Sequence, residues 1–324
     1  MCRTCATIAA MEKTVQTTPM STVNPGGEPL ESNVFKTALL FEGGSMRAAY
    51  TCAFAVKFLE EGLYFDHVYG VSAGSSNTVN YLSRDIWRTH ASFTTFMGQP
   101  GVGNWRTFLQ HKGIFNAHFI YQEAGLPTGV IPFDFDTLRR NPAKLTIVSV
   151  DRDTGEDLYF TKADMPALDD LMVRVRASST IPALMPPPRV DGRWCYDGGF
   201  ADGGGLPVRK IMADGFERMV VIRTRKRGYR KKPGGKWANV LFWRRPHMKR
   251  LVPQRTQRYN EACDLIDQLE AEGRALVIYA DDITLTGSER DVALLEENYQ
   301  AGYAQATRDF PKILAFVQAG EQQA

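Results

Sequence analysis

Two short glycine-containing segments, each next to an apolar run, constrain the fold of this chain most. Glu42–Arg47 (EGGSMR) follows the apolar run Lys36–Phe41, and Gly70–Gly74 (GVSAG) completes the run His67–Val71. Both runs have the length of a buried β-strand, and a helical pattern follows each glycine segment. The sequence therefore predicts two successive strand–turn–helix units, with a glycine turn at the carboxyl end of each strand.

The rest of the chain continues this alternation. Three further apolar runs are typical of buried strands: Leu145–Val150, Met219–Ile222 and Ala275–Tyr279. Helical patterns are expected at Arg47–Glu61, Ala73–Trp87 and Val292–Val317. Such alternation predicts an α/β fold in which helices cover both faces of a mainly parallel sheet. Catalytic groups in these folds lie at the carboxyl ends of the strands, where both glycine segments are expected.

Composition excludes several classes of protein. The apolar content of 44% and charged content of 23% are ordinary for a folded globular chain, and a net charge of +3 is too small to indicate nucleic-acid binding. No stretch approaches the roughly 18 apolar residues of a membrane-spanning helix, and the apolar run Cys5–Met11 is short for a signal peptide. Five cysteines at unrelated spacings argue against a disulfide framework, so a cytoplasmic protein with reduced thiols is expected.

Three regions are predicted. Residues 1–34 are rich in Thr, Pro, Gly and Ser without a sustained period, which indicates a disordered leader. Residues 35–225 contain the strand–helix alternation and form the expected catalytic core. Residues 226–324 are expected to form a basic loop and a C-terminal α/β extension that packs on the core.

Ser72 is the candidate nucleophile. In a strand–G-x-S-x-G–helix unit the serine lies at a strained bend, and small residues on either side avoid collisions with the strand and helix. Gly70 and Gly74 meet this need, and the amides at the start of the next helix favour negative charge at the site. The pattern alone is weak, and a tight turn with an incidental serine is the alternative. The flanking strand and helix favour the nucleophile.

The upstream loop supplies candidate oxyanion donors. Gly43, Gly44 and Ser45 follow a strand and open a helix, so their backbone N–H groups are expected to form an oxyanion hole. Losing one such donor typically costs ~100- to 1,000-fold in rate. A phosphate-binding loop is the competing interpretation, but the segment lacks the G-K-[ST] ending and the G-x-G-x-x-G spacing. Arg47 is expected to stabilise the loop or contact a lipid phosphate, with a solvated arginine as the alternative.

Asp197 is the candidate general base, since none of the five histidines stands in a recognisable triad context. It follows the predicted strand end Trp194–Tyr196 and precedes two glycines that allow close approach. A carboxylate is a weak base in water, so Asp197 is expected in a dry pocket where desolvation raises its pKa. Asp202, five residues later, is the alternative. No His, Asp or Glu cluster has metal-ligand spacing, so neither a metal nor a cofactor is expected.

These three segments, in this order, resemble the patatin-like phospholipase family, which has a G-G-G-x-[RK]-G loop, a G-x-S-x-G elbow and a D-G-[GA] box. Ala177–Pro187 (ASSTIPALMPP) resembles the stretch before the family's aspartate. The resemblance covers roughly residues 36–225 and implies a three-layer α/β/α fold. It also implies hydrolysis of carboxylic esters of phospholipids or lysophospholipids through an acyl-enzyme. By position, Ser72 and Asp197 form the Ser–Asp dyad and residues 43–45 the oxyanion loop.

Two departures from the family pattern stand out. Ser45 replaces the third loop glycine, and Ala48 replaces the glycine after the basic residue. A positive φ at Ser45 would cost of order 1 kcal/mol. The segment after Asp197 is also two residues longer, with Gly203–Gly205 before the next proline. Ser45 and Ala48 give modest support to the alternative that the chain is a catalytically idle membrane-docking or regulatory protein on the same fold, whereas the presence of Ser72 and Asp197 argues against it.

Arg223–Arg250 is a basic segment with twelve Lys or Arg residues and no acidic residue, interleaved with Trp237, Phe242 and Trp243. Basic side chains gain about 1 kcal/mol each near anionic lipid, and tryptophan favours the headgroup level. The segment predicts peripheral contact with a membrane beside an acyl-ester or phospholipid substrate. One alternative is a solvated surface loop. Another is contact with an acidic partner, although nucleic acid is not the expected one.

Overall fold

The computed structural model describes residues 29–322, apart from 104–106, 108, 111–112, 114 and 233–241. The described residues form one eight-stranded sheet in the order β5-β6-β3-β2-β1-β7-β8, with β4 paired to β3. The strands are β1 (Thr37–Phe41), β2 (His67–Val71), β3 (Lys144–Asp151), β4 (Asp157–Phe160), β5 (Arg189–Val190), β6 (Arg193–Asp197), β7 (Arg218–Ile222) and β8 (Ala275–Ile278).

The centre of the sheet is parallel. Strand β1 pairs in parallel with β2 and β7, and parallel pairing continues from β2 to β3 and from β7 to β8. Antiparallel pairs occur only toward one edge of the described sheet, between β3 and β4, β3 and β6, and β5 and β6. Parallel strands are buried on both faces, which explains why five of them stand out in the sequence as apolar runs.

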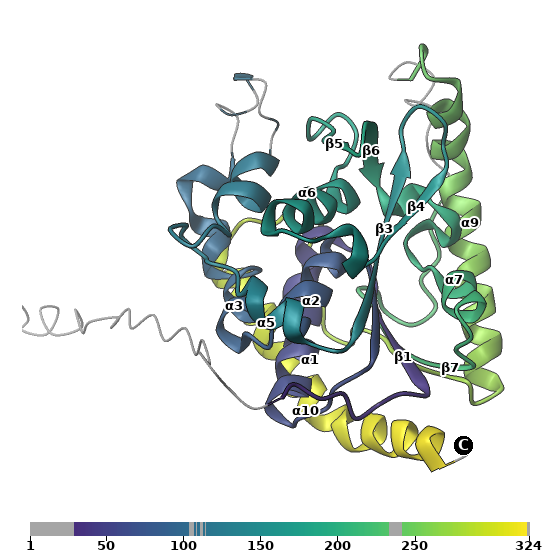
Figure 1. The fold of residues 1–324 in the computed structure, drawn as a ribbon. Helices are drawn as coiled ribbons and strands as arrows, with labels where there is room; N and C mark the ends of the chain where they lie inside the picture. Colours follow the sequence, from purple (N-terminus) through teal and green to yellow (C-terminus); the bar gives the residue numbers. More distant parts are fainter. Residues whose placement is uncertain are drawn as a thin grey trace, which may run out of the picture.

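Helices cover both faces of the sheet, as predicted. Figure 1 shows α1, α2, α3, α5, α6 and α10 on one side, and α7 and α9 on the other. Their bounds are α1 (Ala48–Glu60), α2 (Ala73–Leu82), α3 (Ile86–Ala91), α5 (Phe135–Arg140), α6 (Leu168–Ser179), α7 (Val208–Ala213), α9 (Pro246–Ala271) and α10 (Val292–Gln322). Short 3₁₀ turns lie at Ser45–Arg47, Thr95–Gly98, Pro100–Val102, Lys162–Asp164, Gly198–Phe200 and Asp202–Gly205, and a π-helical turn at Phe119–Glu123. The three-layer α/β/α fold is confirmed.

Alternate side chains of the strands pack into two separate hydrophobic cores, one on each face of the sheet. Leu39 and Phe41 of β1 pack with α1 residues such as Phe54, whereas Leu40 points to the other face and packs with Ile266 of α9. This alternation follows from the two-residue repeat of a strand. One sheet therefore holds both helical layers.

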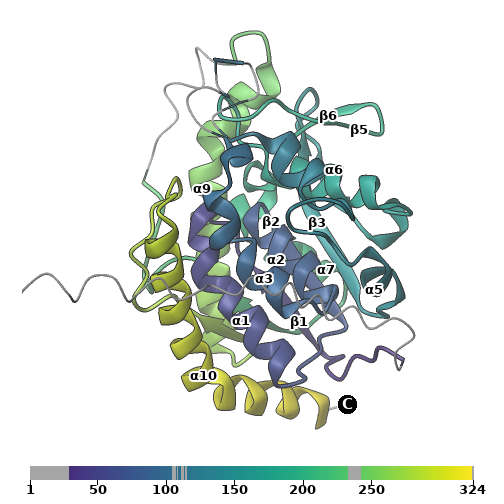
Figure 2. The same cartoon turned by 90° about the vertical axis from the view of Figure 1, so that its left-hand side faces the viewer.

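The C-terminal helix α10 lies against α1 in the helical layer (Figure 2). The contact depends on Gly302, because a Cβ there would lie 2.2 Å from the backbone oxygen of Tyr50. The helix contains Pro311 and extends to Gln322, five residues beyond the expected end at Val317. None of the described helices has the length and apolar character needed to cross a membrane.

Several elements differ from the sequence expectations. The expected helix Ala73–Trp87 is two helices, because Arg84 has φ 57° and the Asp85 side chain caps α3 by accepting the N–H of Arg88. Helix α6 was not predicted from the sequence. Helix α9 begins at Pro246, inside the segment that was expected to be a basic loop.

Residues 33 and 34, the last two of the expected leader, contact the rest of the fold. Val34 is buried and bridges to Phe65, and the Asn33 side chain bonds the backbone of Tyr64. Residues 1–28, with Cys2 and Cys5, lie outside the described residues, as does Trp237.

Candidate active site

Ser72 lies between the end of β2 and the start of α2, at a strained bend. Its φ of 55° is unfavourable for a residue with a side chain, and such strain costs of order 1–3 kcal/mol. A Cβ on Gly70 would lie 2.4 Å from Oγ1 of Thr78, and one on Gly74 would lie 2.1 Å from the backbone oxygen of Phe41. Both glycines are therefore required where the strand, the bend and the helix meet.

Asp197 reaches this bend from a different part of the sheet. It ends β6, which pairs antiparallel with β3 so that Asp197 lies opposite Ser149, and β3 is the neighbour of β2. Ser72 and Asp197 line the same cleft, and the Ser72 hydroxyl lies near enough to the Asp197 carboxylate to lower its pKa. The N–H of Gly199 donates to the same carboxylate at 2.6 Å. The structure thus brings together two predicted site residues that are far apart in the sequence.

The environment of Asp197 suits a base. Only 4% of Asp197 and 7% of Ser72 are exposed. Burial raises the pKa of the Asp197 carboxyl above its ordinary value, while the Arg255 guanidinium and the Ser72 and Gly199 hydrogen bonds oppose that rise. Asp197 is buried, and Arg255 is a charged neighbour that the sequence did not indicate.

Asp202, the alternative base, is placed elsewhere. Its carboxylate forms an ion pair with Arg209 at 3.2 Å, and its backbone N–H donates to Asp157. Asp202 is not among the residues that line the two cavities at Ser72.

The segment Ala177–Pro187 forms hydrogen bonds with the backbones of both Ser72 and Asp197. Oγ of Ser178 accepts the N–H of Ser72 at 2.9 Å and donates to the backbone oxygen of Val148 at 2.6 Å. The backbone oxygen of Thr180 accepts the N–H of Asp197 at 2.9 Å. This segment therefore fixes the bend of Ser72 and the end of β6 relative to each other.

Gly43 and Gly44 lie against the nucleophile strand. A Cβ on Gly43 would lie 2.8 Å from the backbone oxygen of Val71, and one on Gly44 would lie 2.6 Å from Oγ1 of Thr224. In the part of the chain that the structure describes, no group accepts a hydrogen bond from the N–H of either glycine. Both N–H groups are therefore available to a ligand.

Ser45 and Ala48 depart from the family pattern in different ways. Ser45 has the positive φ that its position predicted, 52°, but its hydroxyl donates to the backbone oxygen of Gly287 at 2.6 Å, which offsets the strain. Ala48 has φ −66° and is buried at the start of α1, so a glycine is not needed there.

The oxyanion loop is anchored by a buried carboxylate that the sequence analysis missed. Glu42, directly before Gly43, accepts hydrogen bonds from Nε of Arg223 at 3.0 Å, the N–H of Thr224 at 2.7 Å and the hydroxyl of Tyr259 at 2.6 Å. Burial alone would raise the pKa of Glu42, but Arg223 and these hydrogen bonds hold it below its ordinary value. The sequence feature that could have indicated this anchor is a charged residue, Glu42, directly after a buried strand.

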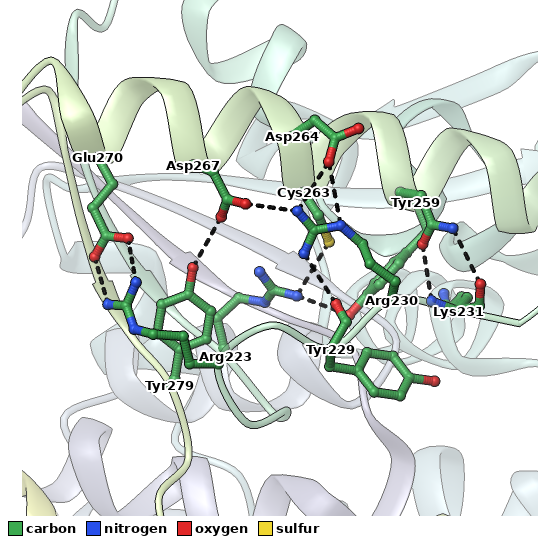
Figure 3. A network of polar contacts seen from close by, with 12 residues as sticks. Arg223, Tyr229, Arg230, Lys231, Tyr259, Cys263, Asp264, Asp267, Glu270 and Tyr279 are labelled. Atoms are coloured by element: carbon green, nitrogen blue, oxygen red, sulfur yellow. Dashed lines mark hydrogen bonds and ion pairs between the residues drawn. The ribbon is translucent and has the colours of Figure 1, made fainter.

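The segment Arg223–Lys232, here called the basic strap, is fastened along α9. Figure 3 shows Arg223 beside Tyr259 and Cys263, and Arg230 between Asp264 and Asp267. Arg227 pairs with Glu270 at 2.8 Å. Three arginines of the basic strap, Arg223, Arg227 and Arg230, are therefore paired with acidic residues of the protein.

Two cavities meet at Ser72. One is a narrow apolar pocket of about 90 Å³, whose wall includes Val79, Phe96, Met97, Ile131 and Val175. The other is a wide polar cleft of about 820 Å³ that also contains Asp197, Gly43, Gly44 and Arg47. Ser45 and Ser72 line both cavities. A molecule with an apolar and a polar part can therefore occupy both sides of Ser72 at once.

Comparison with known proteins agrees with this geometry. Residues 39–209, more than half of the chain, match the family model "Patatin-like phospholipase". The chain belongs to the patatin-like phospholipase family. Residues 245–318 of this patatin-like chain also match a domain of unknown function (DUF6363).

Among solved structures, VipD from Legionella pneumophila matches with 13% identity and a TM-score of 0.46, over 88% of this chain and 67% of that one. A search of curated protein sequences finds no match. Within the described part of the patatin-like chain, no group of three or more His, Cys, Asp or Glu side chains is placed to hold a metal ion.

Proposed function

We propose that this chain is a serine acyl hydrolase that cleaves carboxylic esters of phospholipids, lysophospholipids or related acyl lipids. The observation that carries the proposal is the position of the Ser72 hydroxyl beside the buried Asp197 carboxylate, whose pKa it lowers, at the junction of an apolar pocket and a polar cleft. Membership of a lipid-hydrolase family supports the reaction class.

The proposed reaction has two halves. Asp197 accepts the proton of the Ser72 hydroxyl as Oγ attacks the ester carbonyl, and the N–H groups of Gly43, Gly44 and Ser45 stabilise the oxyanion. The intermediate collapses to an acyl-enzyme, and the leaving alcohol takes the proton from Asp197. A water molecule, deprotonated by Asp197, then attacks the acyl-enzyme; the fatty acid is released as Asp197 returns the proton to Oγ of Ser72.

The apolar pocket supports an acyl chain as the ligand on one side of Ser72. It follows one face of α2, from Ser72 past Ser76 and Val79 to Asn80. At 1.5 Å per helical residue this path is about 12 Å long. Each buried methylene contributes about 0.8 kcal/mol, so a chain that fills the pocket binds much better than an acetyl group.

Hydrolysis of p-nitrophenyl esters tests the proposal. We expect wild-type protein to hydrolyse the decanoate with a higher kcat/KM than the acetate, and Ser72→Ala and Asp197→Asn to lose at least about 100-fold in kcat. Asp202→Asn is the matched control and should keep wild-type activity. Equal loss in Asp202→Asn and Asp197→Asn, or activity that survives in Ser72→Ala, would contradict the proposed dyad. A folded but inert wild type would favour the idle docking protein.

We also propose that the protein meets a membrane at Trp243. Trp243 is 72% exposed, with the Arg244 guanidinium 5.2 Å from its ring centre. The preceding residue, Phe242, packs on Tyr196 and Phe200, which flank Asp197 closely in sequence. This places an exposed tryptophan beside the segment that carries the proposed base.

Vesicle sedimentation tests this contact. Trp243→Ala should reduce binding to vesicles that contain anionic lipid, because tryptophan favours the headgroup region. Hydrolysis of a soluble ester should remain unchanged. Trp87→Ala, which removes another exposed tryptophan on α3, is the control. Equal vesicle binding by wild type and Trp243→Ala would refute the contact.

A further inference from the structure

The polar cleft beside Ser72 carries more positive than negative charge. Six basic residues line it, Arg47, Arg225, Arg230, Lys231, Lys232 and Arg255, against two carboxylates, Glu42 and Asp197. Glu42 is already paired with Arg223, and Arg230 is paired with Asp264 and Asp267. Across the described residues, the other five basic side chains form no ion pair with a carboxylate. The cleft therefore contains cations whose charge the surrounding protein does not neutralise.

The basic strap holds part of this charge in place. Two of its arginines, Arg227 and Arg230, pair with acidic residues of α9, as Figure 3 shows for Arg230. Lys231 lies inside: its backbone N–H donates to Asn260, and its Nζ donates to the backbone oxygen of Gly204 at 3.0 Å. The strap is thus fixed on one side by ion pairs and presents unpaired cations on the cleft side.

Arg255 and Arg47 extend the positive wall to both parts of the catalytic machinery. Nε of Arg255, on α9, donates to the backbone oxygen of Gly199 at 2.9 Å, beside Asp197. Arg47 follows the oxyanion loop, and its buried Nε has no hydrogen-bond partner. The cations therefore surround the side of the cleft on which the leaving group of an ester at Ser72 would lie.

Burial and neighbouring positive charge both disfavour the charged forms of Arg47 and Lys231. Burial and the neighbouring Arg225 lower the pKa of Arg47 to about 10. Burial, followed by Arg255, lowers the pKa of Lys231 well below its ordinary value. An anion bound between them would relieve both effects, because opposite charge within a few ångströms favours the charged form of a base.

We propose that this cleft is a phosphate-binding site for the polar end of the substrate, and that the preferred substrates are acyl lipids whose headgroup has a net negative charge. The inference rests on the proposed function. Arg225, Lys231, Lys232 and Arg255 all lie outside the residues 39–209 that match the family model, so this selectivity is a feature of the C-terminal part of the chain. A choline headgroup would bring a cation toward these side chains and is disfavoured.

Hydrolysis of two lysolipids with the same acyl chain tests the selectivity. Lysophosphatidic acid and lysophosphatidylcholine are presented in neutral detergent micelles at constant ionic strength, since salt screens such interactions. We expect wild type to prefer lysophosphatidic acid in kcat/KM. The double variant Arg225→Gln/Lys232→Gln should reduce that preference by about tenfold or more, because a hydrogen bond to a charged group contributes enough for such a change. Lys226→Gln, an exposed strap residue away from the cleft, should leave the preference intact.

Equal hydrolysis of the two lipids by wild type, or a preference unchanged in the double variant, would overturn the proposal. A binding measurement distinguishes the absence of headgroup selectivity from the absence of esterase activity. Isothermal titration of both lipids into Ser72→Ala should show tighter binding of lysophosphatidic acid whether or not wild type is an esterase, and equal binding would refute the site.

A second arm identifies the source of the phosphate. Inorganic phosphate should inhibit lysophosphatidic acid hydrolysis only weakly compared with a long-chain alkyl phosphate, because the apolar pocket contributes to binding of the lipid. Equal inhibition by the two would indicate a free-phosphate site and contradict the lipid assignment.

Discussion

At the scale of single residues, the site combines strain with compensation. Ser72 and Ser45 both have a positive φ, and both belong to segments where a neighbouring element supplies the stabilising contact. For Ser72 this is Ser178 of α6, and for Ser45 it is the backbone of Gly287. Strain at a functional bend persists only when the surrounding structure fixes it, and these two hydrogen bonds are the means.

The pH dependence of hydrolysis is predicted at the same scale. Asp197 must be deprotonated to act as a base, so kcat/KM for an uncharged ester should fall as pH falls through its pKa. Burial places that pKa above the ordinary value of 3.8, and Arg255 lowers it. Arg255→Gln should therefore move the acid limb to higher pH, whereas Arg255→Lys, which keeps the charge, should move it much less. Identical acid limbs in wild type and Arg255→Gln would contradict this electrostatic role.

At the scale of elements, strands were easier to predict from the sequence than helices. Parallel strands such as β1 are uniformly buried, and their continuous apolar runs are visible without any partner. Ser72 and Asp197 were equally visible, because each lies in a local pattern at a strand end. Tyr259 and Arg255 could not be predicted, because both lie on a polar helix. Tyr259 contacts Glu42 beside the oxyanion loop, and Arg255 contacts the Gly199 backbone, only in the tertiary fold.

The contact between α9 and the oxyanion loop leads to a prediction. Tyr259 donates to Glu42 at 2.6 Å across 217 residues of sequence. Tyr259→Phe leaves a buried carboxylate with one donor fewer, which should lower the free energy of unfolding by about 1–3 kcal/mol and reduce kcat more than it changes KM. Tyr303→Phe is the matched control, because it removes a Tyr–Glu hydrogen bond of the same length at an exposed site. Chemical denaturation and ester kinetics measure both effects, and equal results for the two variants would refute the anchoring role.

At the scale of the whole molecule, the region that matches a domain of unknown function packs in the same folded unit as Ser72 and Asp197. Strand β8 pairs with β7 in the central sheet, and α9 covers one face of that sheet. The same region contributes Arg255 and Tyr259 to the site and the Gly287 backbone to Ser45. We infer that residues 245–318 complete the site rather than form a separate module.

This arrangement predicts one cooperative unfolding transition. Because the two matched regions share a sheet and its cores, neither can lose its packing alone. Unfolding in urea, followed by tryptophan fluorescence and by far-ultraviolet circular dichroism, should give coincident curves. Two separated transitions would show that the C-terminal region folds independently.

Reaction with a fluorophosphonate, followed by mass spectrometry of the digested protein, tests the Ser72–Asp197 dyad most directly. We predict a covalent adduct on the peptide that contains Ser72, formed at least about 100-fold more slowly in Asp197→Asn and at the wild-type rate in Asp202→Asn. An adduct on another serine, or equal labelling rates in wild type and Asp197→Asn, would contradict the mechanism.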